Sequence, residues 1–260
     1  MARSTFYHRL ARAREPDKHA ALRRRILALF HTHKGRYGYR RITLALHNEG
    51  YAVNHKRVER IMRQAGVKSA QRKVRYRSYK GEVGRIAPNL LLREFAADAP
   101  NRKWATDVTQ VSIEGRKCYL SPVLDLYNGE IISYTISEHP DLRMVTEMLR
   151  GALRRVHSTQ GLMLHSDQGW HYQHAMYRRM LEEKGIAQSM SRKGNCLDNA
   201  VMENFFGIMK SELLYLQKWN SMEQFKHELK EYIRYYNNDR IKAKLKGMSP
   251  VKYRTHSLQI

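Results

Sequence analysis

Residues 104–137 read WATDVTQVSIEGRKCYLSPVLDLYNGEIISYTIS, and this stretch decides the fold class. Apolar and β-branched residues dominate three runs within it, and runs of this composition predict strands. The strands are expected over 104–113, 117–127 and 131–137. Glu114-Gly115 and Asn128-Gly129 separate them, and an Asn-Gly pair favours a tight hairpin turn. The stretch therefore predicts three antiparallel strands joined in chain order.

Downstream of this stretch, helical and strand patterns alternate. Two short strands are expected, each after a helix, and two further helices follow them. The expected ranges are 142–157 (helix), 162–166 (strand), 172–184 (helix), 186–190 (strand), 198–216 (helix) and 222–236 (helix). Antiparallel strands followed by alternating helices and strands indicate a mixed α/β sheet.

Upstream of the sheet the chain is strongly basic. Residues 1–80 hold 22 Lys and Arg but only 4 Asp and Glu, and the whole chain has a net charge of +24. Such a concentration of cations predicts a polyanionic partner, and DNA is the obvious one. A ribosomal-type protein or a merely soluble basic surface is the alternative, but the α/β pattern downstream is typical of an enzyme.

The basic region also carries helical periodicity. Three helices are expected over 17–33, 39–48 and 55–64, with Asn54 as the cap of the third. After a short turn, a last helix with a basic face opposite an apolar face fits the DNA-contacting helix of a helix-turn-helix. A solvated basic helix in a small bundle is the alternative. The apolar face is Val58, Ile61 and Met62, and the basic face is Lys56, Arg60 and Arg63.

Residues 68–86 are basic, poor in strand signals and punctuated by tyrosines. They predict a linker that either follows a phosphate backbone, with tyrosines stacking on bases, or is simply solvated. Pro100-Asn101 marks the boundary to the next domain. The expected domains are a helical DNA-binding domain at 1–68, a basic linker at 69–99, a catalytic core at 100–218, and a C-terminal helix and tail at 219–260.

Three acidic residues stand in otherwise apolar elements. Asp107 lies in the middle of the first expected strand, Asp167 ends the fourth, and Glu203 lies one turn into the helix over 198–216. A buried carboxylate is costly unless something positive compensates it. One such acid would usually be a cap or a loop residue, but three make sense together if they converge on cations. Asp125, at the end of the second strand, is the main rival, and Asp198 is expected to cap the helix instead.

The expected metal is Mg²⁺ or Mn²⁺, because hard oxygen ligands select these ions. Two such ions can activate an attacking oxygen and stabilise a leaving one in a phosphoryl displacement. Cys118 and Cys196 have no Cys or His partner at metal-ligand spacing and suit a reducing cytoplasm. No apolar run is long enough to span a membrane and no signal peptide is recognised, so we expect a cytoplasmic protein that joins the nucleoid when it binds DNA.

The motifs WATDVT, HSDQG and GNCLDNAVMENFF followed by KSE resemble those of the OrfB-type transposases of bacterial insertion sequences, whose core resembles retroviral integrases. Asp167 and Glu203 are 36 positions apart, which is the spacing of that family's aspartate, aspartate, glutamate triad. GRYGYRRI at 35–42 and YYNNDRIKAKLKGMSPVKYR at 235–254 look like the family's N-terminal helical domain and C-terminal segment. The resemblance covers essentially the whole chain.

The resemblance implies a ribonuclease-H-like fold, a mixed five-stranded sheet flanked by helices and preceded by the small all-helical basic domain. It implies that Asp107, Asp167 and Glu203 are catalytic metal ligands, with Asp107 bridging two ions. It further implies a DNA transposase that hydrolyses the bond at the 3′ ends of its element and joins the freed 3′ hydroxyl to another phosphodiester. DNA contacts are expected from Lys210, seven residues after Glu203, and from Lys56, Arg60, Arg63, Arg40 and Arg41.

Two features depart from the family pattern. Trp170 and His171 follow Asp167 where a smaller residue and Gln are common, which leaves the detail of that loop open. The chain also lacks the helix-turn-helix protein that the family usually encodes in an upstream frame. The resemblance implies that such a partner, fused to this chain, gives the fully active form, and that the protein acts as a homo-oligomer on DNA. His165 is expected to pack or support rather than to react.

Two other functions stay open at this point. One is a metal-dependent nuclease that hydrolyses DNA without strand transfer. The other is a non-catalytic DNA-binding regulator of the element, although a regulator has no need of three converging acids.

Overall fold

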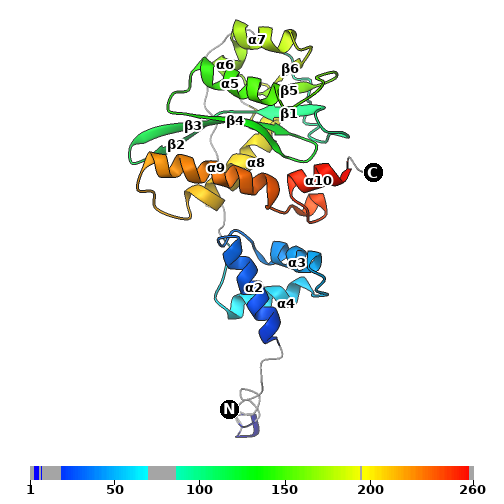
Figure 1. Cartoon of the computed structure of the whole chain (residues 1–260), viewed down its shortest axis with the longest axis vertical. Helices are drawn as coiled ribbons and strands as arrows, with labels where there is room; N and C mark the ends of the chain where they lie inside the picture. Colours follow the sequence, from blue (N-terminus) through cyan, green and yellow to red (C-terminus); the bar gives the residue numbers. More distant parts are fainter. Residues whose placement is uncertain (1–2, 6, 8–18, 70–85, 194, 258–260) are drawn as a thin grey trace. The chain divides into compact units, whose positions relative to one another are not determined.

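The computed structural model describes residues 3–5, 7, 19–69, 86–193 and 195–257. The chain divides into two compact units, Met1–Ala70 and Gln71–Ile260 (Figure 1). Much of the predicted linker, with its alternation of arginine and tyrosine, lies at 70–85, outside the described residues. Within the described ranges, no helix is both long and apolar enough to cross a membrane.

The first unit packs three described helices around a small core. These are α2 (Ala20–Thr32), α3 (Tyr39–Asn48) and α4 (His55–Gln64). The ranges of α3 and α4 are those predicted, and the predicted start of the first helix at residue 17 lies outside the described residues. Arg25 forms an ion pair with Glu49, which holds α2 against the end of α3. The fully buried core side chains include Ile26, Tyr37, Ile42, Leu46 and Val58.

Helix α4 begins and ends as its sequence dictates. The side chain of Asn54 accepts a hydrogen bond from the Lys56 N–H at 2.9 Å, which caps the first turn. Gly66, with φ of +69°, ends the helix in a left-handed conformation that glycine adopts without strain. The predicted division into two faces is present: Val58, Ile61 and Met62 are buried, and Lys56, Arg60 and Arg63 are exposed.

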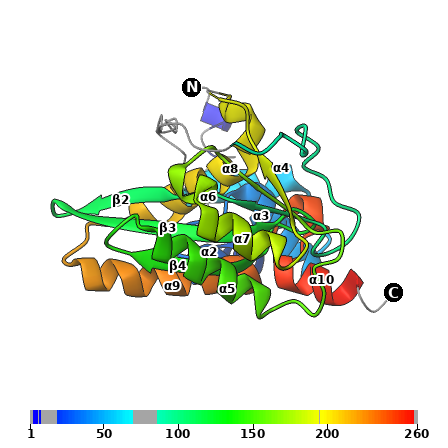
Figure 2. The same cartoon turned by 90° about the horizontal axis from the view of Figure 1, so that it is seen from above.

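The second unit is built on one sheet, shown from above in Figure 2. Strand β3 pairs antiparallel with β4 along one side and with both β1 and β2 along the other. Strand β1 also pairs parallel with β5, and β5 pairs parallel with β6. Counting β1 and β2 as one interrupted strand gives the five-stranded mixed sheet of a ribonuclease-H-like fold. The strands are β1 (Lys103–Thr106), β2 (Thr109–Ile113), β3 (Arg116–Asp125), β4 (Ile131–Ser137), β5 (Met163–Ser166) and β6 (Ala187–Met190).

The interruption between β1 and β2 corrects the single strand expected over 104–113. A carboxylate oxygen of Asp107 accepts a hydrogen bond from the Val108 N–H at 2.7 Å. That N–H is therefore bonded to a neighbouring side chain, and local bonds of this kind compete with a strand ladder. As a result, Asp107 lies just past the C-terminal end of β1 instead of in the middle of a strand.

Helices cover both faces of the sheet (Figure 1). Because strand side chains alternate between faces, Trp104 enters the core shared with α5 and α7, whereas Ala105 enters the core shared with α8 and α9. Both cores are continuous and apolar, so the sheet is held rigidly between two layers. The helices of the first layer are α5 (Leu142–Leu153), α6 (Trp170–Gln173) and α7 (Ala175–Glu182), and those of the second are α8 (Ala200–Met209) and α9 (Met222–Asn238).

Two of the predicted helices are interrupted. The helix expected over 172–184 divides into α6 and α7 at His174, whose backbone is extended (φ −67°, ψ 138°) and whose ring caps α7 by accepting from the Met176 N–H. The helix expected over 198–216 consists of a 3-10 turn at Cys196–Asn199, then α8, then a π-helical turn at Lys210–Leu214. Single π-helical turns occur frequently at functional sites.

A buried ion pair holds the π-helical turn. Two guanidinium nitrogens of Arg240 donate to the two carboxylate oxygens of Glu212, each at 2.8 Å. The Tyr232 hydroxyl donates to the same carboxylate at 3.1 Å. A bidentate pair removed from water fixes the geometry of both partners. The chain that follows α9 thereby holds the end of the helix that began with α8.

The C-terminal segment closes one edge of the sheet. The Asn237 amide donates to the Ile131 carbonyl and accepts from the Ile131 N–H, each at 2.9 Å, so it satisfies backbone groups of the edge strand β4. The Asn128 amide in the β3–β4 turn donates at 2.9 Å to the carbonyl of Pro250, the first residue of α10 (Pro250–Ser257). Part of the segment at 235–254 therefore has a structural role.

Candidate active site

Parallel pairing brings Asp107 and Asp167 to the same edge of the sheet. Ala105 of β1 stands opposite His165 of β5, and each aspartate lies two residues further along its chain. Because β1 and β5 run in the same direction, both carboxylates stand where neighbouring strands end. The predicted position of Asp167 at a strand tip is confirmed, since β5 ends at Ser166.

Glu203 approaches this edge from helix α8. Met202, Phe205 and Phe206 of that helix are buried in the core beneath the sheet, so α8 is anchored on both sides of Glu203. The charge of Glu203 acts on Asp107, because it contributes to raising the pKa of that carboxyl. The fold thus brings the three predicted acids into one region.

The pKa values show what these acids experience. Burial is the largest cause that raises the pKa of Asp107 well above its ordinary value, and the charge of Asp167 is the second. Burial also raises the pKa of Asp167, while a hydrogen bond from the Gly169 N–H opposes that shift. Carboxylates that repel one another in a poorly hydrated place are strongly stabilised by a cation bound between them.

The donor atoms are suited to a hard divalent cation, because all of them are carboxylate oxygens. One oxygen of Asp107 is bonded to the Val108 N–H at 2.7 Å, and one oxygen of Asp167 is bonded to the Gly169 N–H at 2.9 Å. Among the described residues, no three His, Cys, Asp or Glu side chains lie close enough together to hold one ion. The donor chemistry therefore fits Mg²⁺ or Mn²⁺, although the described side chains do not surround a single ion position.

Lys210 belongs to the same group of charges. It directly follows the last residue of α8 and opens the π-helical turn. Its positive charge lowers the pKa of Asp107, against the effects of burial and of the other acids. Lys210 is therefore a cation that this part of the chain supplies toward Asp107.

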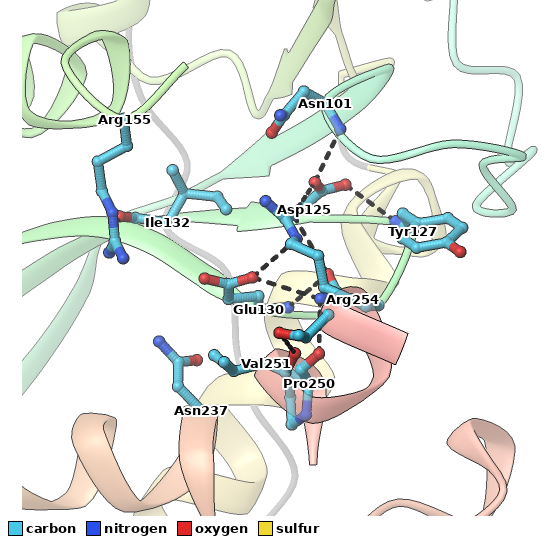
Figure 3. A network of polar contacts seen from close by, with 12 residues as sticks. Asn101, Asp125, Tyr127, Glu130, Ile132, Arg155, Asn237, Pro250, Val251 and Arg254 are labelled. Carbon is cyan, nitrogen blue, oxygen red and sulfur yellow. Dashed lines mark hydrogen bonds and ion pairs between the residues drawn. The ribbon is translucent and has the colours of Figure 1, made fainter. Parts of the chain in front are cut away.

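Asp125, the rival acid, lies in a separate network (Figure 3). Its buried carboxylate accepts hydrogen bonds from the backbone N–H groups of Asn101 and Tyr127, at 2.9 and 3.0 Å, and from Arg254. The same guanidinium lies 2.9 Å from Glu130. Burial raises the pKa of Asp125, whereas the hydrogen bonds from the Tyr127 and Asn101 N–H groups and the charge of Arg254 oppose that shift. Asp125 thus joins β3 to α10 and does not belong to the group around Asp107.

Asp198 is not the N-cap of the long helix, which corrects the sequence-based expectation, since Asn199 holds that position. Its fully buried carboxylate accepts from Asn89 at 3.0 Å, from Arg93 at 2.8 Å and from three N–H groups of Arg192 at 2.9–3.0 Å. The bond with the Arg192 side chain is the main cause that holds the pKa of Asp198 below its usual range. Asp198 therefore ties the segment before the sheet to the loop that leads into α8.

Comparisons with known proteins show the family of the chain. Models described as integrase core domains match residues 97–196 and 203–258, and a model described as an HTH-like domain matches residues 17–75. InsK of insertion sequence element IS150 from Escherichia coli strain K12 is 52% identical over 255 residues, which are 98% of this chain and 90% of InsK. The chain belongs to the insertion-sequence transposases.

A further relative is also named as an insertion-sequence transposase. The transposase of insertion sequence element IS904 from Lactococcus lactis is 34% identical over 238 residues, which are 91% of this chain and 94% of that protein. Among solved structures, the HTLV-2 integrase catalytic core domain in complex with magnesium covers 60% of this chain and 98% of its own, at 17% identity and a TM-score of 0.48. The resemblance to OrfB-type transposases with an integrase-like core is confirmed by the family matches.

Two residues near Asp167 in the transposase have clear surroundings. His165 is fully buried with Nδ1 2.8 Å from the Ser189 hydroxyl, and burial lowers its pKa to about 4, so it is neutral at neutral pH. Tyr172, which the sequence analysis missed, is buried beside the acids. Burial, and then the charges of Asp107 and Asp167, raise its pKa well above 10.0 and keep the phenol protonated. No spacing in the sequence singled it out.

The expected DNA-contact residues of the first unit have different surroundings. Arg40, at the start of α3, is exposed, and so are Lys56, Arg60 and Arg63 on α4. Arg41 is half-buried: it donates to the Arg36 carbonyl at 3.3 Å, and its guanidinium carbon lies 5.7 Å from the centre of the Tyr37 ring. Arg41 is thus partly engaged within its own unit.

The raised pKa of Asp107 yields a stability prediction. A carboxyl whose folded-state pKa is raised makes the fold less stable as the pH rises from its unfolded value, about 3.8, toward the folded value. In a chelating buffer at neutral pH, Asp107→Asn should therefore melt a few degrees higher than the wild type, since about 1 kcal/mol moves Tm by about 2–4 °C in a chain of this size.

Thermal unfolding from pH 5 to pH 8 provides the measurement. Asp141→Asn is the matched control, because Asp141 caps α5 by accepting from the Met144 N–H and asparagine caps equally well. An Asp107→Asn protein that melts no higher than the wild type at neutral pH would contradict the claim that the charged Asp107 carboxylate lowers the stability of the fold.

Proposed function

We propose that the transposase cuts and joins DNA strands with Asp107, Asp167 and Glu203 as its catalytic carboxylates. The observation that carries the proposal is their convergence: the charges of Asp167 and Glu203 both act on the buried Asp107. The acids come from three elements far apart in sequence, and the integrase core matches contain all three, with the second match beginning at Glu203.

Mg²⁺ or Mn²⁺ is the cofactor that these residues suit. Asp107 and Asp167 would hold one ion, and Glu203 would complete a second site together with Asp107. When bound, two such ions activate the attacking oxygen and stabilise the leaving one in an in-line displacement at phosphorus. The all-carboxylate donor set supports this choice over zinc, which favours nitrogen and sulfur ligands.

The remaining residues around the site have supporting tasks. The ammonium of Lys210 offers a mobile point charge to a DNA phosphate next to the acids. The protonated Tyr172 adds no further negative charge beside two carboxylates, and with its buried neighbours it keeps that side of the site dry. The buried pair of Arg240 and Glu212 holds the end of the helix on which Lys210 lies.

The proposed chemistry has two steps that differ only in the attacking group. In the first, the oxygen of water bonds to phosphorus at the end of the element and a 3′ hydroxyl leaves. In the second, that 3′ hydroxyl bonds to a phosphorus of another strand, a P–O bond there breaks, and its oxygen takes up the proton. No covalent bond to the protein is required in either step.

DNA is the proposed partner of both units. The HTH-like match over residues 17–75 and the exposed cations of α4 support a duplex contact in the first unit. From the resemblance to OrfB-type transposases, the proposal includes homo-oligomers on DNA and a partner protein from an upstream frame. A nuclease that never joins strands remains the second candidate, and joined products separate the two.

The first test replaces the acids without changing their shape. Asp107→Asn, Asp167→Asn and Glu203→Gln should each lower Mg²⁺-dependent cleavage and strand transfer of the element's terminal DNA by about a thousandfold or more. The affinity for DNA in chelating buffer should stay near that of the wild type, because the expected DNA-contact residues of the first unit are unchanged. Gel analysis of cut and joined strands gives both rates.

Asp125→Asn is the control, because Asp125 is a buried acid outside the proposed site. This substitution should lower the stability of the fold, because it weakens the ion pair with Arg254. It should have a smaller effect on the rate of DNA cleavage at saturating Mg²⁺. A glutamine or asparagine variant of the triad that cuts at the wild-type rate would exclude that residue from the site.

A separate prediction concerns the footprint on α4. Lys56→Ala, Arg60→Ala and Arg63→Ala should each reduce the slope of log affinity against log salt by about 0.9 on duplex DNA, since each phosphate contact releases counterions. Arg179→Ala, which removes an exposed arginine paired with Glu183 on α7, should leave the slope unchanged. Equal slopes for all four variants would show that the phosphate contacts are made by residues outside α4.

A further inference from the structure

Trp170 differs from the other tryptophans of the transposase in its exposure to solvent. Trp104 and Trp219 are buried at 0% and 9% exposure, whereas Trp170 is 49% exposed. A single exposed apolar side chain is common on protein surfaces and needs no explanation by itself. The position of this indole, three residues after Asp167, is what makes it informative.

The loop between Asp167 and Trp170 is held in place by hydrogen bonds. The Gly169 N–H donates to the Asp167 carboxylate at 2.9 Å. The Gln168 amide donates to the Ser191 carbonyl, just past β6, at 3.0 Å. The indole therefore stands at a fixed place next to a proposed catalytic carboxylate.

The indole is also supported from one side. Its centroid lies 4.1 Å from that of the His171 ring, with 30° between the two planes. His171 is only 8% exposed, and its Nε2 lies 2.8 Å from the Pro140 carbonyl, which fixes the imidazole. A rigid aromatic ring backed by a second ring, and half open to solvent, has the form of a stacking platform.

We propose that Trp170 stacks on an unpaired nucleobase next to the phosphodiester that the site acts on. This inference rests on the proposed function, because it takes DNA as the molecule at Asp167. Nucleic-acid bases stack on exposed aromatic rings irrespective of sequence, since every base has a flat π face. A base within a duplex is already stacked on both sides, so only a base that has left its pair reaches Trp170.

The chemistry of the surface favours a base over an apolar protein partner. Exposed Lys193 lies two residues after Ser191, to which the loop is bonded, so a cation that suits a phosphate backbone stands close to that contact. The alternative occupant of the indole is a second copy of the chain. In that case Trp170→Ala would change the oligomeric state of the protein in the absence of DNA.

The test uses the full-length chain carrying Asp107→Asn, so that DNA is bound without being cut. A short oligothymidylate and a duplex of the same length are titrated while tryptophan emission is recorded in a chelating buffer. The single strand should quench the emission of Trp170, and Trp170→Ala should abolish the quenching. The same variant should weaken single-strand binding by about tenfold to a hundredfold and duplex binding by much less.

Met176→Ala is the matched control, because Met176 on α7 is an exposed apolar side chain of similar exposure (47%) without an aromatic ring. Trp170→Phe should keep part of the single-strand affinity that Trp170→Ala loses, since phenylalanine also stacks. Equal single-strand binding by the alanine variant and its parent, or a change in its oligomeric state without DNA, would overturn the proposal.

Failure of the platform and failure of the proposed function can be told apart. If the wild-type chain cuts DNA but oligothymidylate leaves the tryptophan emission of the Asp107→Asn chain unchanged, only the proposal for Trp170 is wrong. If oligothymidylate quenches Trp170 while the intact chain cuts no DNA with Mg²⁺ or Mn²⁺, the platform stands and the catalytic assignment fails.

Discussion

Like charges held at one edge of a single sheet are the constraint on which the second unit depends. Strands β1 and β5 run parallel in a register that places Asp107 and Asp167 at neighbouring strand ends. Both carboxylates are withdrawn from water, and the pKa of each is raised. An arrangement of this kind lowers the stability of the fold and persists only where the surrounding structure determines it strongly.

That surrounding structure is built from ion pairs placed outside the acidic group. Asp198 and its two arginines secure the entry into α8, and Glu212 with Arg240 secures the exit, so the helix that carries Glu203 is held at both ends. Asp125 with Arg254 joins the neighbouring strand to the C-terminal helix. In each pair the carboxylate has its own arginine, whereas the carboxylates around Asp107 act on one another and on Lys210.

Much of this architecture follows from the sequence, because its signals are local. The hairpin at Asn128-Gly129, the cap at Asn54 and the two-faced helix α4 depend on residues a few positions apart, and the structure contains them as expected. The convergence of Asp107, Asp167 and Glu203 was expected because three buried acids are difficult to explain separately and because their order and spacing resemble those of a known family.

Other features escaped the sequence analysis because their causes are not local. Asp125 and Arg254 are 129 positions apart, so nothing near Asp125 indicated that an arginine neutralises it. Asp198 has the residue type and position of an N-cap, yet its partners include Asn89 and Arg93, which lie more than a hundred positions earlier. The break between β1 and β2, where the Asp107 carboxylate accepts from the Val108 N–H, and the π-helical turn at Lys210–Leu214 also had no signal in the periodicity of the sequence.

The central claim is that the acids around Asp107 form the metal-dependent centre of the transposase. The most direct measurement is to locate Mn²⁺ by its anomalous X-ray scattering in crystals of the full-length protein. The account predicts density for Mn²⁺ between the side chains of Asp107 and Asp167, with a second ion toward Glu203 when DNA is present. Mn²⁺ bound at Asp125 or at another group of acids, with none at Asp107, would contradict it.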